Sequence, residues 1–280
     1  MKLTILVDNN TIVDRFYLGE PALSVLIETE NKKILLDTGY SDVFLKNAAK
    51  MNINLLDIDE LLISHGHNDH TMGLIPYIKY IMEKKDEDLK LKKPILRMHP
   101  YALIPKIDSK IGNIGMMISE KELNHHFKVI KSTTPVHITE RLVFLGEIER
   151  QNDYEKVENP AKTTVNEREV DDILLDDTAL VYKSHKGLVI ITGCSHSGIC
   201  NICSYAKKVC EDDRIIDIIG GLHLQNPPSE RLNKTIRYLK DSNVKQLHAC
   251  HCTDLKSKIA IGKEIPVIEV GAGMVIKFNE

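Results

Sequence analysis

The sequence predicts an α/β protein, and its apolar pattern, its length and the order of its elements support this. Apolar runs of strand length recur along the chain, and between them lie stretches with the spacing of amphipathic helices. The first half is strand-rich, whereas strand and helix alternate in the second half, as in an α/β sheet. A chain of 280 residues can bury enough apolar surface to fold as one large domain or two small ones.

The first half of the chain is expected to hold five strands and two helices. One helix, residues 41–51, can turn Val43, Ala48 and Met51 inward, and the other spans residues 73–84. The strands are predicted at residues 3–7, 24–28, 33–36, 61–64 and 95–98.

A polar segment, residues 149–172, separates the two halves. It follows an apolar run at 143–148 and has almost no periodic apolar signal of its own. It is longer than an ordinary connection, and loops of that length are usually functional covers or disordered. We therefore expect one domain over residues 1–280, with this segment inserted as a mobile cover.

The second half is expected to begin with a hairpin and to continue as an alternation of helix and strand. The hairpin strands are predicted at 179–182 and 188–192, the helices near 198–210 and 230–240, and the later strands at 215–219 and 245–249.

Charge and composition exclude several classes of function. The 37 basic and 40 acidic residues give a net charge of −3 with both signs spread along the chain, so nucleic acid is not a favoured partner. Asp8 interrupts the apolar start too early for a secretion signal, and no run approaches the roughly 18 apolar residues of a membrane span. We therefore expect a cytoplasmic protein whose six cysteines are reduced thiols or ligands.

Four possible metal ligands, His65, His67, Asp69 and His70, crowd together directly after the apolar run that ends at Ile63. Histidines two positions apart at the exit of a strand can point the same way, while the two residues after them can face a second point nearby. Imidazole nitrogens with one carboxylate suit Zn²⁺, Fe or Mn²⁺ better than Ca²⁺. The cluster predicts a centre for one or two transition-metal ions.

The pattern His-x-His-x-Asp-His after an apolar strand resembles the metallo-β-lactamase superfamily. Leu35-Leu36-Asp37-Thr38-Gly39 is similar to the family's first motif, in which the aspartate orients the metal ligands. Three later segments, ITGCSHSG at 191–198, GGLHL at 220–224 and HCT at 251–253, resemble one subgroup. That subgroup is named for the 7,8-dihydropterin-6-methyl-4-(β-D-ribofuranosyl)aminobenzene-5′-phosphate synthase of methanopterin biosynthesis. The resemblance covers nearly the full chain and implies a four-layer αββα sandwich with its active site at one edge between the two sheets.

The resemblance also implies six metal ligands, three for each of two ions. They are His65, His67 and His196 for the first ion, and Asp69, His70 and His251 for the second. In many relatives a metal-bridging aspartate follows the glycine that is Gly193 here, whereas this chain has Cys194. A thiolate from Cys194 can ligate instead, and His196 or His223 can supply the missing donor, so a mononuclear or asymmetric site stays open.

The catalytic candidates are Asp69 and His223. His223 ends an apolar run, so its imidazole is expected at the same rim of the sheet as the other strand-end ligands. His99 is similarly placed and is a candidate substrate contact. The cations expected are one or two of Zn²⁺, Fe or Mn²⁺, with Mg²⁺ as a further option.

Cys200, Cys203 and Cys210 superficially resemble an iron–sulfur spacing, but they match neither ferredoxin pattern. On a helix over 198–210 they share one stripe with apolar residues, where free cysteine behaves as a small buried hydrophobe. We therefore expect them to be structural.

Three functions remain open. In the subgroup that the chain resembles, an arylamine displaces diphosphate from a dihydropterin methyl diphosphate and forms a C–N bond. In a hydrolase of the same fold, metal-activated water attacks a phosphorus or carbonyl centre. The third, from another class, is a metal-bearing sensor or redox module. Both enzyme interpretations predict a small substrate, phosphorylated in the first, and the oligomeric state is left open.

Overall fold

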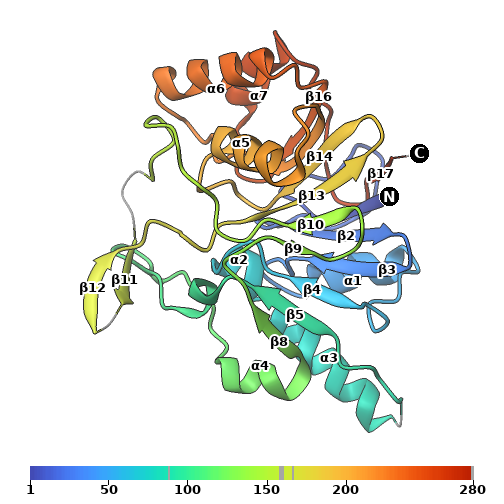
Figure 1. Ribbon diagram of the computed structural model, residues 1–280. Coiled ribbons are helices and arrows are strands. Elements are labelled where there is room, and N and C mark those ends of the chain that lie inside the picture. The colour runs from blue at the N-terminus through green and yellow to red at the C-terminus, as the bar shows by residue number, and fades with distance from the viewer. Residues whose placement is uncertain (88, 158–160, 166, 279–280) are drawn as a thin grey trace. The chain divides into compact units, whose positions relative to one another are not determined.

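The computed structural model describes residues 1–87, 89–157, 161–165 and 167–278 (Figure 1). The chain divides into two compact units. The described residues of the first unit come from Met1–Ser132, Pro160–Asp172 and Gly271–Asn279, and those of the second from Thr133–Asn159 and Ile173–Val270. Each unit has its own sheet and its own apolar core, and each is described by itself.

The first unit is built on a seven-stranded sheet in the order β17-β1-β2-β3-β4-β5-β8. β17, β1, β2 and β3 pair antiparallel, whereas β3, β4, β5 and β8 pair parallel, so the last four strands end at the same edge. The strands are β1 (Lys2–Val7), β2 (Ser24–Thr29), β3 (Lys32–Leu36), β4 (Glu60–Leu62), β5 (Ile95–Met98), β8 (Lys128–Lys131) and β17 (Val275–Lys277).

Helices of the first unit cover the sheet through one continuous apolar core. Phe44 of α1, Tyr77 of α3 and Leu123 of α4 are buried in the same cluster as Leu61 and Leu96 of the sheet. Burying side chains of this size stabilises the fold by roughly 1.5–3 kcal/mol each. The helices are α1 (Val43–Lys50), α2 (Asn68–Thr71), α3 (Leu74–Asp86), α4 (Glu120–His126) and the 3₁₀ helix η1 (Pro100–Leu103).

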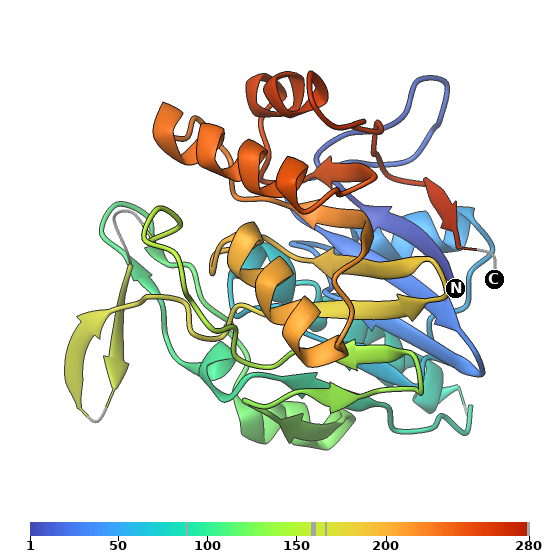
Figure 2. The same ribbon diagram turned by 45° about the horizontal axis from the view of Figure 1, so that its top comes forward.

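A second, four-stranded sheet of the first unit contains part of the polar segment that the sequence left without structure. Its order is β12-β11-β6-β7, with β11 (Lys162–Val165), β12 (Arg168–Asp171), β6 (Ile107–Asp108) and β7 (Gly112–Asn113). The β11–β12 pair, drawn in yellow, extends away from the seven-stranded sheet in Figure 1 and Figure 2. Both strands are short and largely exposed, so neither has the apolar alternation by which a strand is recognised. Residues 158–160 and 166 of the predicted cover lie outside the described residues.

The second unit is built on a six-stranded sheet in the order β16-β15-β14-β13-β10-β9, in which β14, β15 and β16 run parallel. Helices α5, α6 and α7 gather beside β14 and β16 (Figure 1) and share one core with Val181, Ile190 and Ile218. The elements are β9 (Val136–His137), β10 (Leu142–Phe144), β13 (Ala179–Ser184), β14 (Gly187–Thr192), α5 (Ile199–Cys210), β15 (Ile215–Gly221), α6 (Ser229–Asp241), β16 (Gln246–Cys250) and α7 (Leu255–Gly262).

The predicted strands and helices of both halves are present, with ends shifted by a few residues. α4 and α7 were not predicted, because both are short and their sequences lack a clear apolar stripe. Each instead begins at a side-chain cap: Ser119 accepts from the Glu122 N–H at 3.2 Å, and Asp254 accepts from the Ser257 N–H at 2.7 Å. Within the described part of the chain, no helix has the length and apolar character needed to cross a membrane.

Candidate metal centre

Parallel strands bring three of the predicted residues of the first unit to one edge. Asp37 follows β3, His65 lies shortly after β4, and His99 follows β5. Because these strands are parallel neighbours, their carboxyl ends share an edge of the sheet, which is where α/β proteins bind ligands. Their order in the sheet therefore assembles a polar edge from residues far apart in sequence.

The histidine cluster has the geometry of a metal site. His65, His67 and Asp69 each offer one ligand atom, and these atoms lie within 4.8 Å of one another. His65 Nε2 is 3.1 Å from His67 Nδ1, and the His65 and His70 rings are 4.3 Å apart. Two imidazoles and a carboxylate at such spacing match the donors that transition metals prefer. The structure therefore brings His65, His67 and Asp69 together, with the ring of His70 beside that of His65.

Asp37 stabilises the cluster through hydrogen bonds with Ser64 and His70. It is fully buried and accepts hydrogen bonds from the Ser64 N–H at 2.7 Å and the Ser64 hydroxyl at 2.6 Å. The oxygen that accepts from the Ser64 hydroxyl, Oδ2, also lies 2.7 Å from His70 Nδ1. A carboxylate on one ring nitrogen fixes the tautomer of a histidine and turns the other nitrogen outward, as in metalloenzymes. This is the arrangement expected of a residue that orients ligands.

The two histidines that flank Asp69 have opposite acid–base properties. Burial, together with the charge of Lys106, lowers the pKa of His67 to about 4, although the charge of Asp69 opposes this shift. Burial also acts to lower the pKa of His70, but Asp69 and Asp37 outweigh it and raise that pKa well above the usual value of 6.5. His67 is therefore neutral at physiological pH, the form in which imidazole binds a metal.

Two glycines make the close packing around the cluster possible. A Cβ on Gly66, between the two histidines, would lie 2.4 Å from the Ala102 carbonyl oxygen. A Cβ on Gly73 would lie 2.1 Å from the Thr38 carbonyl oxygen. Larger residues at either position would push the ligand loop away from its support.

A buried ion pair lies beside the cluster and was not predicted. Lys106 is fully buried, and its Nζ is 3.0 Å from an oxygen of Asp172, which directly follows β12. Burying two charges is costly unless they pair, so this contact ties the end of the polar segment to the loop that precedes β6. No local pattern in the sequence marks this contact, because the partners are 66 positions apart.

In the second unit, three neighbouring parallel strands each end near a predicted residue. Cys194 and His196 follow β14, His223 follows β15, and His251 follows β16. At each end the backbone enters the left-handed region, with φ of 61° at Ser195, 50° at His223 and 48° at His251. Such conformations are uncommon outside glycine and cluster at functional sites, because they redirect side chains at an energetic cost.

His223 lies among the other predicted residues of this edge. Its ring centroid is 4.2 Å from that of His196. Its Nδ1 is buried and has no hydrogen-bond partner among the described residues, so a polar group of this edge remains to be satisfied. The structure thus places the His223 ring beside that of His196, and a catalytic role for His223 stays a prediction.

Cys252 is a further residue of this edge; it belongs to the HCT motif at 251–253, but no role was predicted for it from the sequence. Its Sγ accepts from the His223 N–H at 3.3 Å and donates to the Cys194 carbonyl at 3.3 Å. Burial acts to raise the pKa of this thiol, but contacts with Cys194, His223 and His251 lower it well below its ordinary value of 9.0. A lowered pKa marks a thiol as a candidate functional group. Two of the neighbours that lower the pKa of Cys252, Cys194 and His223, come from other strand ends, so only the fold could reveal it.

Asp177 fixes the turn that carries His196. The carboxylate accepts from the Ser197 N–H at 2.8 Å and from the Ser197 hydroxyl at 2.5 Å. Burial raises the pKa of Asp177, and the bonds from Ser197 lower it only in part. In the second unit it occupies a supporting position comparable with that of Asp37 in the first.

The remaining histidines and cysteines are largely accounted for by structure. His99 is buried, and its Nδ1 accepts from the Tyr101 N–H at 3.1 Å as the cap of η1, while substrate contact there stays a prediction. His248 lies 3.0 Å from Asp217 in a buried pair. The three cysteines of α5 are buried, as predicted, and burial raises the pKa of each thiol; they are Cys200, Cys203 and Cys210.

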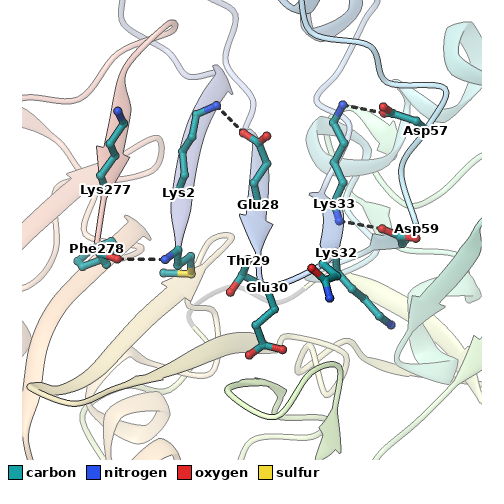
Figure 3. Close-up of a pocket in the computed structure, with 12 residues that line it drawn as sticks. Lys2, Glu28, Thr29, Glu30, Lys32, Lys33, Asp57, Asp59, Lys277 and Phe278 are labelled. Carbon is teal, nitrogen blue, oxygen red and sulfur yellow. Dashed lines mark hydrogen bonds and ion pairs between the residues drawn. The ribbon is translucent and has the colours of Figure 1, made fainter. Parts of the chain in front are cut away.

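A hollow of the first unit lies at the wrong end of the sheet for this chemistry. Its volume is about 590 Å³, and it lies where β3 begins, whereas Asp37 follows the end of β3 (Figure 3). Its charges largely satisfy one another: Lys2 pairs with Glu28 at 2.6 Å and Lys33 with Asp57 at 2.6 Å. Surface pairs of this kind contribute little and leave no reactive group.

Comparisons with known proteins agree with this architecture. A family model described as the metallo-beta-lactamase superfamily matches residues 18–85. A protein of Methanocaldococcus jannaschii named 7,8-dihydropterin-6-methyl-4-(beta-D-ribofuranosyl)-aminobenzene-5′-phosphate synthase is 32% identical, covering 93% of this chain and 90% of that relative. A second, uncharacterised protein of that organism is 31% identical and covers 91% of each chain.

The fold is found in solved structures as well. The crystal structure of a metal-dependent hydrolase of the beta-lactamase superfamily matches with a TM-score of 0.84 and 27% identity, covering 100% of both chains. The predicted resemblance and the predicted fold class are both confirmed by these matches.

Proposed function

The chain belongs to the metallo-β-lactamase superfamily, and from that membership we propose that it is a metal-dependent enzyme acting on a phosphorylated or diphosphate-bearing small molecule. The observation that carries the metal dependence is the cluster of His65, His67 and Asp69, whose ligand atoms lie within 4.8 Å of one another. Their donor chemistry fits Zn²⁺, Fe or Mn²⁺. The low pKa of His67 supports the fit, because a proton does not compete for that imidazole at neutral pH.

The proposed ligands are the six residues of the family pattern. They are His65, His67 and His196 for a first ion, and Asp69, His70 and His251 for a second. Cys194 stands where relatives have a bridging aspartate, and we propose its thiolate as the substitute donor, with a single-ion site as the alternative. Asp37 orients His70 through its 2.7 Å contact.

The reaction we propose is the condensation after which the 32% identical relative is named. It joins a dihydropterin to a ribofuranosyl aminobenzene phosphate. A bound divalent cation would supply positive charge for the diphosphate that departs. The arylamine nitrogen forms a C–N bond to the pterin methyl carbon while the C–O bond to diphosphate breaks, and the nitrogen loses a proton. Asp69, which is partly exposed beside His70, is the proposed acceptor of that proton, and His223 is proposed to contact the reacting groups.

A second candidate function is hydrolysis of a phosphoester or carboxylic ester. It is favoured by the full-length match to a metal-dependent hydrolase at 27% identity. The two enzyme functions differ in the nucleophile, which is an arylamine in one and water in the other. A metal-bearing sensor or redox role is the alternative of another class, and the buried, high-pKa cysteines of α5 disfavour a cluster there.

The test combines metal analysis with two assays on anaerobically purified protein. We expect one to two equivalents of transition metal, and turnover of dihydropterin methyl diphosphate with an arylamine but not of a phosphodiester panel. The control is the His248→Ala variant, which lacks a buried histidine of the second unit that is not a proposed ligand. It should keep both metal and activity. Hydrolysis of the panel without condensation would select the second candidate. Metal-free protein with full activity would refute both.

We also propose that the chain acts in the cytoplasm as one domain.

Residues 149–172 are proposed to form a cover over the bound substrate. Glu155, Thr163 and Asp172 of this segment are buried, so any mobility belongs to its exposed parts. Replacing residues 164–169 by two glycines should leave metal content and the melting temperature within a few degrees while lowering turnover. Hydrogen exchange as slow in β11 and β12 as in the central strands would contradict the cover.

A further inference from the structure

A second hollow, of about 350 Å³, lies within the second unit at the start of α6. Its lining includes Pro228 and Arg231 of the first turn of α6, and Lys234 one turn further on. Tyr154 and Lys156 line it from the segment that follows β10. None of these residues belongs to the proposed metal ligands.

Arg231 is the residue of this hollow that most needs a partner. It is 8% exposed, and its Nε is buried without a hydrogen-bond partner among the described residues. No ion pair of its guanidinium is found in the described part of the chain either. A buried guanidinium without an anion is costly, whereas one that meets a carboxylate or phosphate forms strong, directional bonds. The side chain therefore points to an anion that the protein itself does not supply.

The start of α6 adds to this preference. α6 has 13 residues, and no side chain caps its first turn, because the N-cap residue is Pro228. Uncapped N–H groups and the helix dipole favour negative charge at that position. An anion in the hollow would therefore meet both the guanidinium and the amide groups.

The charges that line the hollow are positive on balance. Lys156, Arg231 and Lys234 outnumber Asp153 and Glu230, a difference of one positive charge. Glu230 already pairs with Lys234 at 2.8 Å, which leaves two cations, Arg231 and Lys156, against one anion, Asp153. Arginine is the side chain best suited to a phosphate, because its planar fork binds two oxygens at once.

The hollow lies at the same edge of the second unit's sheet as His196 and His223. α6 begins shortly after His223, which follows β15. Glu155 holds the other wall in place, because its carboxylate accepts from the Cys200 and Asn201 N–H groups at 3.0 Å each, in the first turn of α5. α5 in turn begins directly after the turn that carries His196.

We propose that this hollow binds the phosphate monoester of a small-molecule substrate, away from the group that reacts. The inference rests on the proposed function and deepens it, because it assigns the substrate a phosphate that is not the leaving group. A volume of about 350 Å³ accommodates a phosphate with part of the sugar that carries it. Arg231 binds the phosphate oxygens, the first turn of α6 donates to them, and Lys156 adds long-range attraction.

The test is calorimetric titration of the metal-loaded protein with ribose 5-phosphate and with ribose. We expect ribose 5-phosphate to bind and ribose not to bind. Arg231→Gln should weaken binding about tenfold, the effect of losing one charge-assisted contact. Arg237→Gln removes the same charge from an exposed position of the same helix and should leave the dissociation constant unchanged.

Two further variants separate this inference from the proposed function. Lys156 is exposed, so Lys156→Gln should fold normally and weaken binding about threefold, as expected for a peripheral charge. His67→Ala removes a proposed metal ligand and should still bind ribose 5-phosphate with the wild-type constant. Wild-type affinity in both Arg231→Gln and Lys156→Gln, or loss of binding in His67→Ala alone, would overturn the inference. A metal-free or inactive wild-type protein that still shows the Arg231 effect would refute the proposed function and leave the inference standing.

Discussion

The two units hold their candidate ligands in different ways. In the first unit, one loop after β4 carries His65, His67, Asp69 and His70, and a single buried aspartate, Asp37, holds that loop. In the second unit, the residues come one or two at a time from three strand ends. A local cluster depends on turn chemistry, whereas a distributed set depends on the register of a whole sheet. A substitution in the cluster of the first unit should therefore remove most of the bound metal. A substitution in the distributed set of the second unit should remove only part of it.

The largest expected effect is that of His67→Ala in the first unit. It removes a neutral imidazole from the centre of the cluster, so we expect loss of most of the bound metal. Turnover should fall at least about 100-fold, more than is typical when a residue that only hydrogen-bonds to a metal ligand is replaced. His125→Ala, on the exposed surface of α4, is the matched control. Elemental analysis of both variants checks the result, and an unchanged metal content in His67→Ala would remove the basis of the metal centre.

The comparison sharpens with His196→Ala in the second unit. His196 is proposed for the same ion as His67 but belongs to the distributed set, so this variant should lose about one of two equivalents and keep the other, with turnover lowered about 100-fold. His248→Ala removes a buried histidine that pairs with Asp217 in the same sheet and should keep both equivalents. Equal and complete metal loss from His67→Ala and His196→Ala would mean that the two units do not differ as we propose.

A smaller effect is expected for Asp37→Asn. The change keeps the shape of the side chain but weakens its contacts with His70 and Ser64, so metal affinity should fall about 10–100-fold. Asp8→Asn alters another fully buried aspartate of the first unit, one that accepts from the Asn10 N–H, and serves as the control. Competition with a chelator measures the two affinities, and equal values would show that Asp37 does not act through the ligands.

The smallest effect at neutral pH concerns the cysteines of α5. Burial raises the pKa of Cys210 to about 11 and that of Cys203 further still, from 9.0 in the unfolded chain. These thiols therefore contribute stability that is complete below about pH 9 and is lost as the pH rises toward the folded values. The free energy of unfolding should fall by up to about 1.4 kcal/mol per pH unit for each such thiol above pH 9.

Denaturant titrations between pH 7 and pH 11 check this slope, and Cys203→Ala should reduce it. Thiol labelling at pH 7 should be slow for both cysteines until the protein unfolds. Rapid labelling of the native protein would show that α5 exposes them.

How much could be read from the sequence follows from the same comparison. His65 to His70, Asp37 and the strand before each could be predicted, because ligand, spacing and strand lie within a few residues of one another. His196, His223 and His251 could be named as candidates, but their common edge depends on the parallel order of β14, β15 and β16. That order is a long-range property of pairing.

The residues that escaped prediction are those whose partners are far away. Lys106 meets Asp172 across 66 positions, and nothing near either residue marks the contact. Arg231 looks like one more charge on an amphipathic helix, and only its burial in the fold gives it meaning. β11 and β12 are recognised by pairing with each other and with β6, since their own residues have no strand-like alternation.

The pairing of β17 with β1 constrains how the protein can mature. β17 is made long after β1, yet the two strands are neighbours in one sheet, with Lys2 opposite Lys277. The Met1 amino group also donates to the Phe278 carbonyl at 3.0 Å. During synthesis, one edge of β1 therefore stays unpaired until β17 has been made, and an unpaired edge is prone to pairing with other chains. A nascent chain stalled before residue 275 would therefore be expected to need chaperone protection, although its histidine cluster is already made.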